Sequence, residues 1–178
     1  KKFYKYYLET ICNILNDIGV NINTIPVMDL LQKGTNEIIL SRSYSNNKNT
    51  IISLAKFCIS YLKKKKICSV VKHAPGHGCA NTDSHKKLPV VLKKPKLLYK
   101  DDFSLFKNSK SKFMMTSHIL YKKVDPLYLA TFSKYIIKNI IRKKLKFNGI
   151  LISDDISMGA LSQNLILNSE KALNAGCN

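Results

Sequence analysis

The chain has 178 residues, a length that suits one domain with its own buried core. Its hydrophobic content of 45% is typical of a globular protein and excludes an intrinsically disordered chain. No apolar run approaches the roughly 20 residues that a membrane-spanning helix needs, so we expect no membrane partner.

The net charge of +19 is at first sight typical of a nucleic-acid-binding protein. Only Arg42 and Arg142 are arginine, however, and the other basic residues are lysines scattered along the chain. Proteins that read bases favour arginine, because its planar group makes two hydrogen bonds at once. The excess of Lys, Asn and Ile instead indicates the composition bias of an AT-rich genome. We therefore expect no specific nucleic-acid partner.

The cysteines are odd in number, widely spaced and mostly set in apolar runs. They are Cys12, Cys58, Cys68, Cys79 and Cys177. This pattern does not suit a disulfide framework. It is typical of reduced, buried thiols in a cytoplasmic protein.

The first elements are predicted to be a helix, a strand and a loop. Residues 3–18 carry apolar side chains at helical spacing, and Gly19 suits a C-terminal cap. Residues 20–28 follow as a strand that ends at Asp29. Residues 30–46 hold turn signals and are expected to form a loop.

The middle of the chain is predicted to be a helix, a strand and a long loop. The helix covers residues 47–66, and its final lysines suit the negative end of a helix dipole. We interpret those lysines as a solvated helix end. Residues 67–72 form the strand. The loop after it holds a proline and two glycines that a packed helix could not accommodate so close together.

Two strands and three helices complete the prediction. The helix over residues 95–108 has proline in its first turn, where the missing N–H costs nothing. After it come a strand over residues 113–116, a helix over 131–145, a strand over 150–152 and a helix over 161–175.

Alternation of strands and helices favours an α/β fold with a parallel sheet covered by helices. The polar groups follow the carboxyl ends of the strands, where a (β/α)₈ TIM-type barrel has its active site. A complete barrel takes roughly 250 residues, and the chain provides about four to five β/α units. We therefore expect residues 1–178 to form a single domain, an incomplete barrel of this type.

Two stretches carry the chemistry. Residues 72–89 read KHAPGHGCANTDSHKKLP and hold three of the four histidines. Residues 149–158 read GILISDDISM, an apolar run followed by two adjacent acids. Histidine and carboxylate at the ends of separate strands are typical of an acid/base group and a nucleophile.

The chain carries four motifs in a fixed order: KH-x-PGHG-x(4)-DSH followed by LP, then H-x-x-Y-x-x-x-D, then TFS, then SDD-x-SM. With these motifs in this order, the chain resembles the bacterial β-N-acetylhexosaminidases of glycoside hydrolase family 3. The match runs from about Gly19 to Cys177. It implies a retaining exo-glycosidase that removes terminal β-linked N-acetylglucosamine from peptidoglycan fragments. The implied substrate is a small carbohydrate of the GlcNAc-anhydro-muropeptide type. The resemblance also implies a role in peptidoglycan recycling in the cytoplasm, a protein that is a monomer when full length, and no metal or other cofactor.

The resemblance assigns three catalytic residues. Asp154 matches the nucleophile, and a carboxylate can attack the anomeric carbon to form a glycosyl-enzyme. His85 matches the acid/base, since an imidazole can give and take a proton near neutral pH. Asp83 would hold the ring of His85. The alternative for each is a capping or turn residue, which is how we interpret Asp155.

Three further residues match positions that bind sugar hydroxyls: Lys72, His73 and Arg42. Lysine offers three hydrogen-bond donors and histidine one or two, and arginine can clamp two oxygens at once. The alternative for Lys72 and His73 is ordinary packing at a strand end. Ser41 and Ala74 depart from the family pattern, and Ala74 leaves its loop with a smaller anchor.

The remaining polar residues of the motifs are expected to play lesser parts. We interpret Asp29 and His77 as structural, and we expect His118 and Asp125 to line the mouth of the site. Histidines beside Cys79 would be compatible with zinc, but their spacing is not that of a standard site.

Two other functions stay open. A family 3 β-glucosidase would keep the fold, although the DSH loop argues against it. An inactive fragment or binding remnant is the second alternative, because by resemblance the barrel has further units before residue 1 and after residue 178. We therefore expect the segment alone to have little activity and to aggregate through its exposed strand edges.

Overall fold

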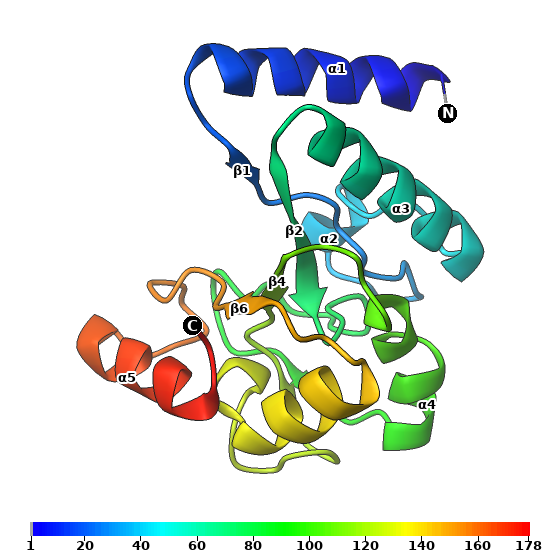
Figure 1. Ribbon diagram of the computed structural model, residues 1–178. Coiled ribbons are helices and arrows are strands. Elements are labelled where there is room, and N and C mark those ends of the chain that lie inside the picture. The colour runs from blue at the N-terminus through cyan, green and yellow to red at the C-terminus, as the bar shows by residue number, and fades with distance from the viewer. Residues whose placement is uncertain (1) are drawn as a thin grey trace.

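The computed structural model describes residues 2–178 and contains a parallel sheet surrounded by helices (Figure 1). The sheet has the strand order β1-β2-β4-β6. Its strands are β1 (Ile22–Asn23), β2 (Cys68–Ala74), β4 (Phe113–Thr116) and β6 (Ile150–Ile152). Two more parallel strands, β3 (Val90–Val91) and β5 (Leu120–Tyr121), form a small second sheet.

The helices connect and cover these strands. They are α1 (Lys2–Asp17), α2 (Glu37–Leu40), α3 (Lys48–Lys64), α4 (Pro95–Lys100), η1 (Phe103–Phe106), η2 (Ala130–Phe132), η3 (Ile136–Lys144) and α5 (Leu165–Ala175). The side chain of Asn47 caps α3 by accepting from two backbone N–H groups. Gly176 ends α5 with a φ of 114°, a conformation that glycine adopts without strain.

This arrangement confirms the predicted fold class, an α/β domain of the TIM-barrel type with an incomplete barrel. All pairs in the sheet are parallel, so the carboxyl ends of the strands lie at one edge. The two outer strands expose apolar side chains, with Ile22 43% and Ile150 44% accessible to solvent. Such uncovered strands are typical of a sheet that does not close on itself.

The predicted strand over residues 20–28 is too long. Only Ile22 and Asn23 pair regularly, and one isolated bridge joins Val27 to Lys72. Pro26 lies between these two contacts and has no N–H to donate to a ladder, which interrupts the strand.

The predicted helix over residues 95–108 is also interrupted, after Lys100. The carboxylate of Asp102 turns inward and is fully buried. It accepts a hydrogen bond of 2.6 Å from Gln32 Nε2 and lies 3.3 Å from Lys93 Nζ. These tertiary contacts outweigh the helical pattern, so α4 ends and the short 3₁₀ helix η1 follows.

The predicted helix over residues 131–145 lies in the expected place but is wound differently. A 3₁₀ turn begins it, and η3 has π-helical hydrogen bonding. The predicted apolar face is confirmed by five buried side chains, those of Ile136, Ile137, Ile140, Ile141 and Leu145. The last predicted helix begins at Leu165 rather than 161, because the side chain of Asn164 caps it.

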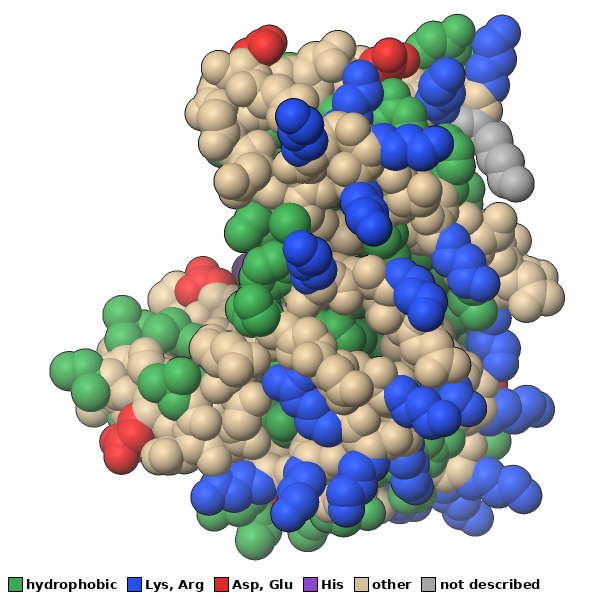
Figure 2. Space-filling model, viewed as in Figure 1, with side chains coloured by type: hydrophobic (Ala, Val, Ile, Leu, Met, Phe, Trp, Pro, Cys, Tyr) green, Lys and Arg blue, Asp and Glu red, His purple; other side chains and the backbone are tan. Residues whose placement is uncertain are grey.

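Lysine and arginine side chains are spread over the face in Figure 2, with neutral and apolar surface between them. On this face, the scatter agrees with a composition bias rather than with one positively charged patch that binds anions. Within residues 2–178, no helix is both long enough and apolar enough to cross a membrane.

The buried face of η3 gives a test of the core. Replacing Ile140, which is fully buried, by Ala should lower the free energy of unfolding by about 2–5 kcal/mol, because a cavity is left. The matched control is Ile166→Ala on α5, where the side chain is 83% exposed and the loss should be about 0.5 kcal/mol or less. Urea unfolding measures both, and equal losses would contradict this packing.

Candidate active site

One pocket at the carboxyl ends of the strands contains all six residues that the sequence singled out. It is lined by Asn36, Ile38, Ile39, Arg42, Lys72, His73, His77, Asp83, Ser84, His85 and Asp154. The residues come from the loop around α2, the end of β2, the loop before β3 and the end of β6. Segments far apart in the sequence therefore meet at one site.

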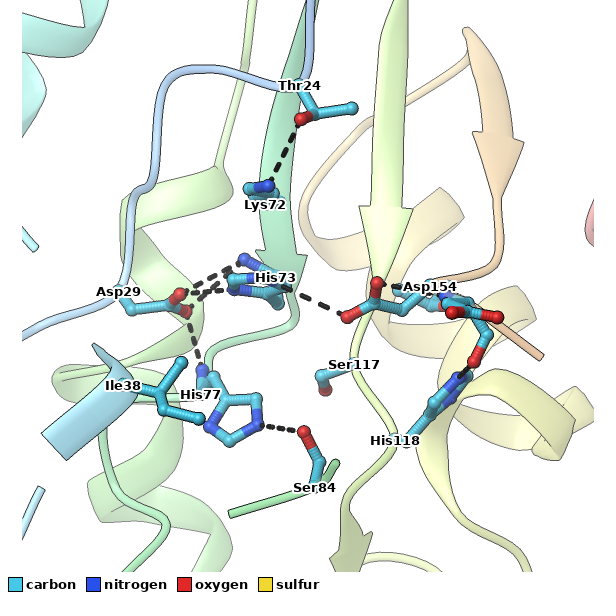
Figure 3. A network of polar contacts seen from close by, with 12 residues as sticks. Thr24, Asp29, Ile38, Lys72, His73, His77, Ser84, Ser117, His118 and Asp154 are labelled. Carbon is cyan, nitrogen blue, oxygen red and sulfur yellow. Dashed lines mark hydrogen bonds and ion pairs between the residues drawn. The ribbon is translucent and has the colours of Figure 1, made fainter. Parts of the chain in front are cut away.

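The floor of the pocket is built on the carboxylate of Asp29, which is fully buried (Figure 3). Its Oδ2 lies 2.6 Å from Nδ1 of His73, and its Oδ1 accepts a 2.6 Å hydrogen bond from the N–H of His77. Burial alone would raise the pKa of Asp29, but the charges and hydrogen bonds of these histidines outweigh it and lower the pKa.

His73 connects this floor to the end of β6. Its Nε2 lies 3.9 Å from Oδ2 of Asp154. β4 lies between β2 and β6, so the two strands are about 10 Å apart at the usual strand spacing. Their side chains nevertheless point toward each other (Figure 3).

Asp83 and His85 form a local pair, as the sequence predicts. Oδ1 of Asp83 accepts from the backbone N–H of His85 and lies 2.8 Å from its Nδ1. The little burial of Asp83 would raise its pKa, but these hydrogen bonds lower it. The side chain of His85 is 53% exposed, so its Nε2 is free to meet a ligand.

The segment that carries His85 is fastened on two sides. Ser84 Oγ lies 3.2 Å from Nε2 of His77. The N–H groups of Gly159 and Ala160 each donate a 3.0 Å hydrogen bond, to the carbonyl oxygens of His85 and Ser84. A Cβ at Gly159 would lie 2.5 Å from that His85 oxygen, so only glycine permits the approach.

The two acids after β6 have different surroundings. Asp154 points into the pocket, and its Oδ1 accepts from the N–H of Asp155. The carboxylate of Asp155 instead accepts from the N–H and the hydroxyl of Ser157, which hold its pKa below the ordinary value. Asp155 therefore has the geometry of a turn residue, as predicted.

Two cationic side chains lie at the pocket wall. Lys72 donates to Thr24 Oγ1, and Arg42 donates through Nε to the carbonyl oxygen of Ile38. Burial lowers the pKa of Lys72, and the nearby charge of Arg42 lowers it further. The bond to Ile38 uses Nε of Arg42, and the side chain is one of those that line the pocket.

The expectation that His118 and Asp125 line the mouth of the site is wrong. His118 is buried and bonded to Thr131 Oγ1 and to the carbonyl oxygen of Asp155. Asp125 caps a turn by accepting from two N–H groups, and it also accepts from the hydroxyl of Ser133. Both side chains are already occupied by local structure.

Sequence reasoning missed the parts that Ser84 and Gly159 play. Gly159 acts through its backbone N–H, and Ser84 acts through its carbonyl oxygen and through its hydroxyl beside the ring of His77. Such contacts leave no residue pattern. The signal that could have found them is their place beside the DSH and SDD motifs. Among residues 2–178, no group of three or more His, Cys, Asp or Glu side chains is arranged to hold a metal ion.

The fold and the pocket together define a TIM-barrel-like α/β domain whose strand ends carry acidic, imidazole and cationic groups. The chain belongs to glycosyl hydrolase family 3, because the family's N-terminal domain matches residues 7–178. A β-hexosaminidase of Psychromonas ingrahamii is 34% identical over 164 residues, which are 89% of this chain and 48% of that protein. The chain thus spans about half the length of the curated relatives that it matches.

Solved structures agree with this assignment. A family 3 β-N-acetylglucosaminidase from Paenibacillus sp. superposes with a TM-score of 0.91 at 26% identity, covering 99% of this chain and 35% of that one. NagZ from Neisseria gonorrhoeae, in complex with N-trifluoroacetyl-D-glucosamine, superposes with a TM-score of 0.86 at 29% identity. The match covers 98% of this chain and 50% of NagZ.

The buried ring of His77 predicts a loss of stability in acid. Burial lowers the pKa of His77 to about 4, below the ordinary value of 6.5. The neutral ring therefore contributes fully above pH 6.5, and the contribution is lost as the pH falls toward 4. The loss is about 3 kcal/mol, since each pKa unit is worth about 1.4 kcal/mol.

The variant His77→Asn should remove this pH dependence, and urea unfolding between pH 4 and 7 measures it. Asp102 changes stability in the opposite sense, because burial raises its pKa to about 6. The difference between wild type and variant isolates His77, since Asp102 is present in both. Parallel stability profiles would contradict a buried, neutral ring.

Proposed function

We propose that this chain carries the active site of a retaining exo-glycosidase acting on terminal, non-reducing β-linked N-acetylglucosamine. Its substrates would be peptidoglycan fragments of the GlcNAc-anhydro-muropeptide type. The observation that carries the proposal is the shared pocket, which is lined both by Asp154 from the end of β6 and by the Asp83–His85 pair from the loop before β3. The names of the relatives, β-hexosaminidase and β-N-acetylglucosaminidase, support the sugar class.

The proposed reaction has two displacements. Asp154 attacks the anomeric carbon, the glycosidic C–O bond breaks, and protonated His85 gives its Nε2 proton to the leaving oxygen. Neutral His85 then takes a proton from water, and that water releases the sugar from Asp154. Asp83 holds Nδ1 of His85, which fixes the orientation of the ring.

Binding of the sugar is assigned to Arg42, Lys72 and His73. Each lines the pocket beside Asp154. Arg42 and Lys72 supply donors for hydroxyl oxygens, and Nε2 of His73 is its only ring nitrogen not taken up by Asp29. No cofactor enters this chemistry, because a nucleophile and an acid/base group suffice.

The cellular setting follows from the substrate proposed. We assign the protein to peptidoglycan recycling in the cytoplasm, acting as a monomer. Its cysteines support a reducing compartment, because all five are free, and three of them are buried. N-Trifluoroacetyl-D-glucosamine bound to NagZ supports recognition of a 2-acylamino sugar.

A fluorinated N-acetylglucosaminyl fluoride tests the two catalytic roles. The test uses a protein that carries this chain and spans the full length of its relatives. The wild type should gain the mass of one sugar, because fluoride leaves without a proton and the glycosyl-enzyme accumulates. Asp154→Ala should not be labelled, whereas His85→Ala should be labelled but should release the sugar about 100-fold or more slowly. Intact-mass spectrometry measures both. Labelling of Asp154→Ala would exclude Asp154 as the nucleophile.

A pair of aryl glycosides tests the sugar class. The two substrates differ only at C2. The first burst of aryl alcohol from the N-acetylglucosaminide should exceed that from the glucoside, because the proposed site recognises the 2-acylamino group. Absorbance after rapid mixing measures the burst, and Asp154→Ala is the blank. A larger burst from the glucoside would instead support a β-glucosidase.

A further inference from the structure

Asp29 lies where two lines of contact meet, one leading to Asp154 and the other to His85. We infer that Asp29 is a positioning residue that sets the nucleophile and the acid/base group relative to each other. The inference rests on the proposed function for the roles of those two groups. It assigns to Asp29 a part in catalysis beyond holding a loop.

The first line of contact runs through His73. A carboxylate only accepts hydrogen bonds, so the 2.6 Å contact of Asp29 Oδ2 requires the proton of neutral His73 to be on Nδ1. Nε2 then carries a lone pair and faces Asp154 across 3.9 Å. Asp29 thus keeps neutral His73 from donating to Oδ2 of Asp154 and leaves it able to accept from a sugar hydroxyl.

The second line of contact runs through His77. The other oxygen of Asp29 accepts its backbone N–H at 2.6 Å. Nε2 of the same residue reaches Ser84, which lies between Asp83 and His85. His77 is only 3% exposed, so its ring has little freedom to reorient.

The two lines start from one rigid group. The two oxygens of Asp29 belong to one planar carboxylate, and charge-assisted hydrogen bonds of 2.6 Å are short and strong. Moving either histidine stretches a bond to the same carboxylate. The separation of the two catalytic groups is therefore set from beneath the pocket, as well as by the loops that carry them.

Asn in place of Asp29 keeps the shape but supplies only one acceptor. If its oxygen accepts from the N–H of His77, its NH₂ group faces His73 and requires the proton on Nε2 instead. Long-range ¹H–¹⁵N correlation of [¹⁵N]histidine-labelled protein at about pH 8 distinguishes the two neutral tautomers. The control is Asp102→Asn, another fully buried carboxylate, whose partners are Gln32 and Lys93.

We expect Nδ1–H for His73 in the wild type and in Asp102→Asn, and Nε2–H in Asp29→Asn. The fluorosugar should also label Asp29→Asn about 100-fold more slowly, a loss typical of misplaced reacting groups. If His73 carries its proton on Nε2 in the wild type, the inference is overturned. This outcome does not depend on whether Asp29→Asn folds. An unchanged tautomer in folded Asp29→Asn also overturns it.

Ser84→Ala tests the second line of contact separately. It should be labelled at the wild-type rate, because labelling needs no acid, and should release the sugar about tenfold more slowly, because release needs His85 as base. Release at the wild-type rate would overturn this line. Failure of the wild type to label would reject the proposed function, whereas the tautomer of His73 would still decide the part of Asp29.

Discussion

The pocket depends on one ionised carboxylate enclosed by protein. Removing a carboxylate from water costs several kcal/mol unless hydrogen bonds replace the lost hydration. Around Asp29 the replacements are the ring of His73 and the backbone N–H groups of His73 and His77. The end of β2 and the turn after it are thereby held against the segment between β1 and α2. The polar groups of the pocket are arranged around this attachment.

The extent of the fold that could be predicted follows from the range of the forces involved. β4 and β6 match their predictions residue for residue, because each is a short apolar run between turn residues. The helix ends near Asn47 and Gly176 could also be predicted, since capping is a local interaction. The break after Lys100 could not be predicted, because it depends on the contact of Asp102 with Gln32, which is far away in the sequence.

The candidate site divides in the same way. Strand-end position and motif order were sufficient to gather six residues that line one pocket. They did not reveal that Asp29 lies beneath that pocket, because its partners are a ring nitrogen and backbone N–H groups from beyond α3. They also assigned His118 to the mouth, whereas Thr131 and the carbonyl oxygen of Asp155 hold it in the interior.

The pocket is unequally anchored. Its floor is buried and belongs to the strands, while the rim residue His85 is half exposed and rests on a few hydrogen bonds. Evolution can therefore exchange the rim by insertion or deletion without disturbing the floor, since loops tolerate such changes better than strands do. Descendants of such a scaffold could acquire new binding preferences at the exposed rim while the buried floor stays unchanged.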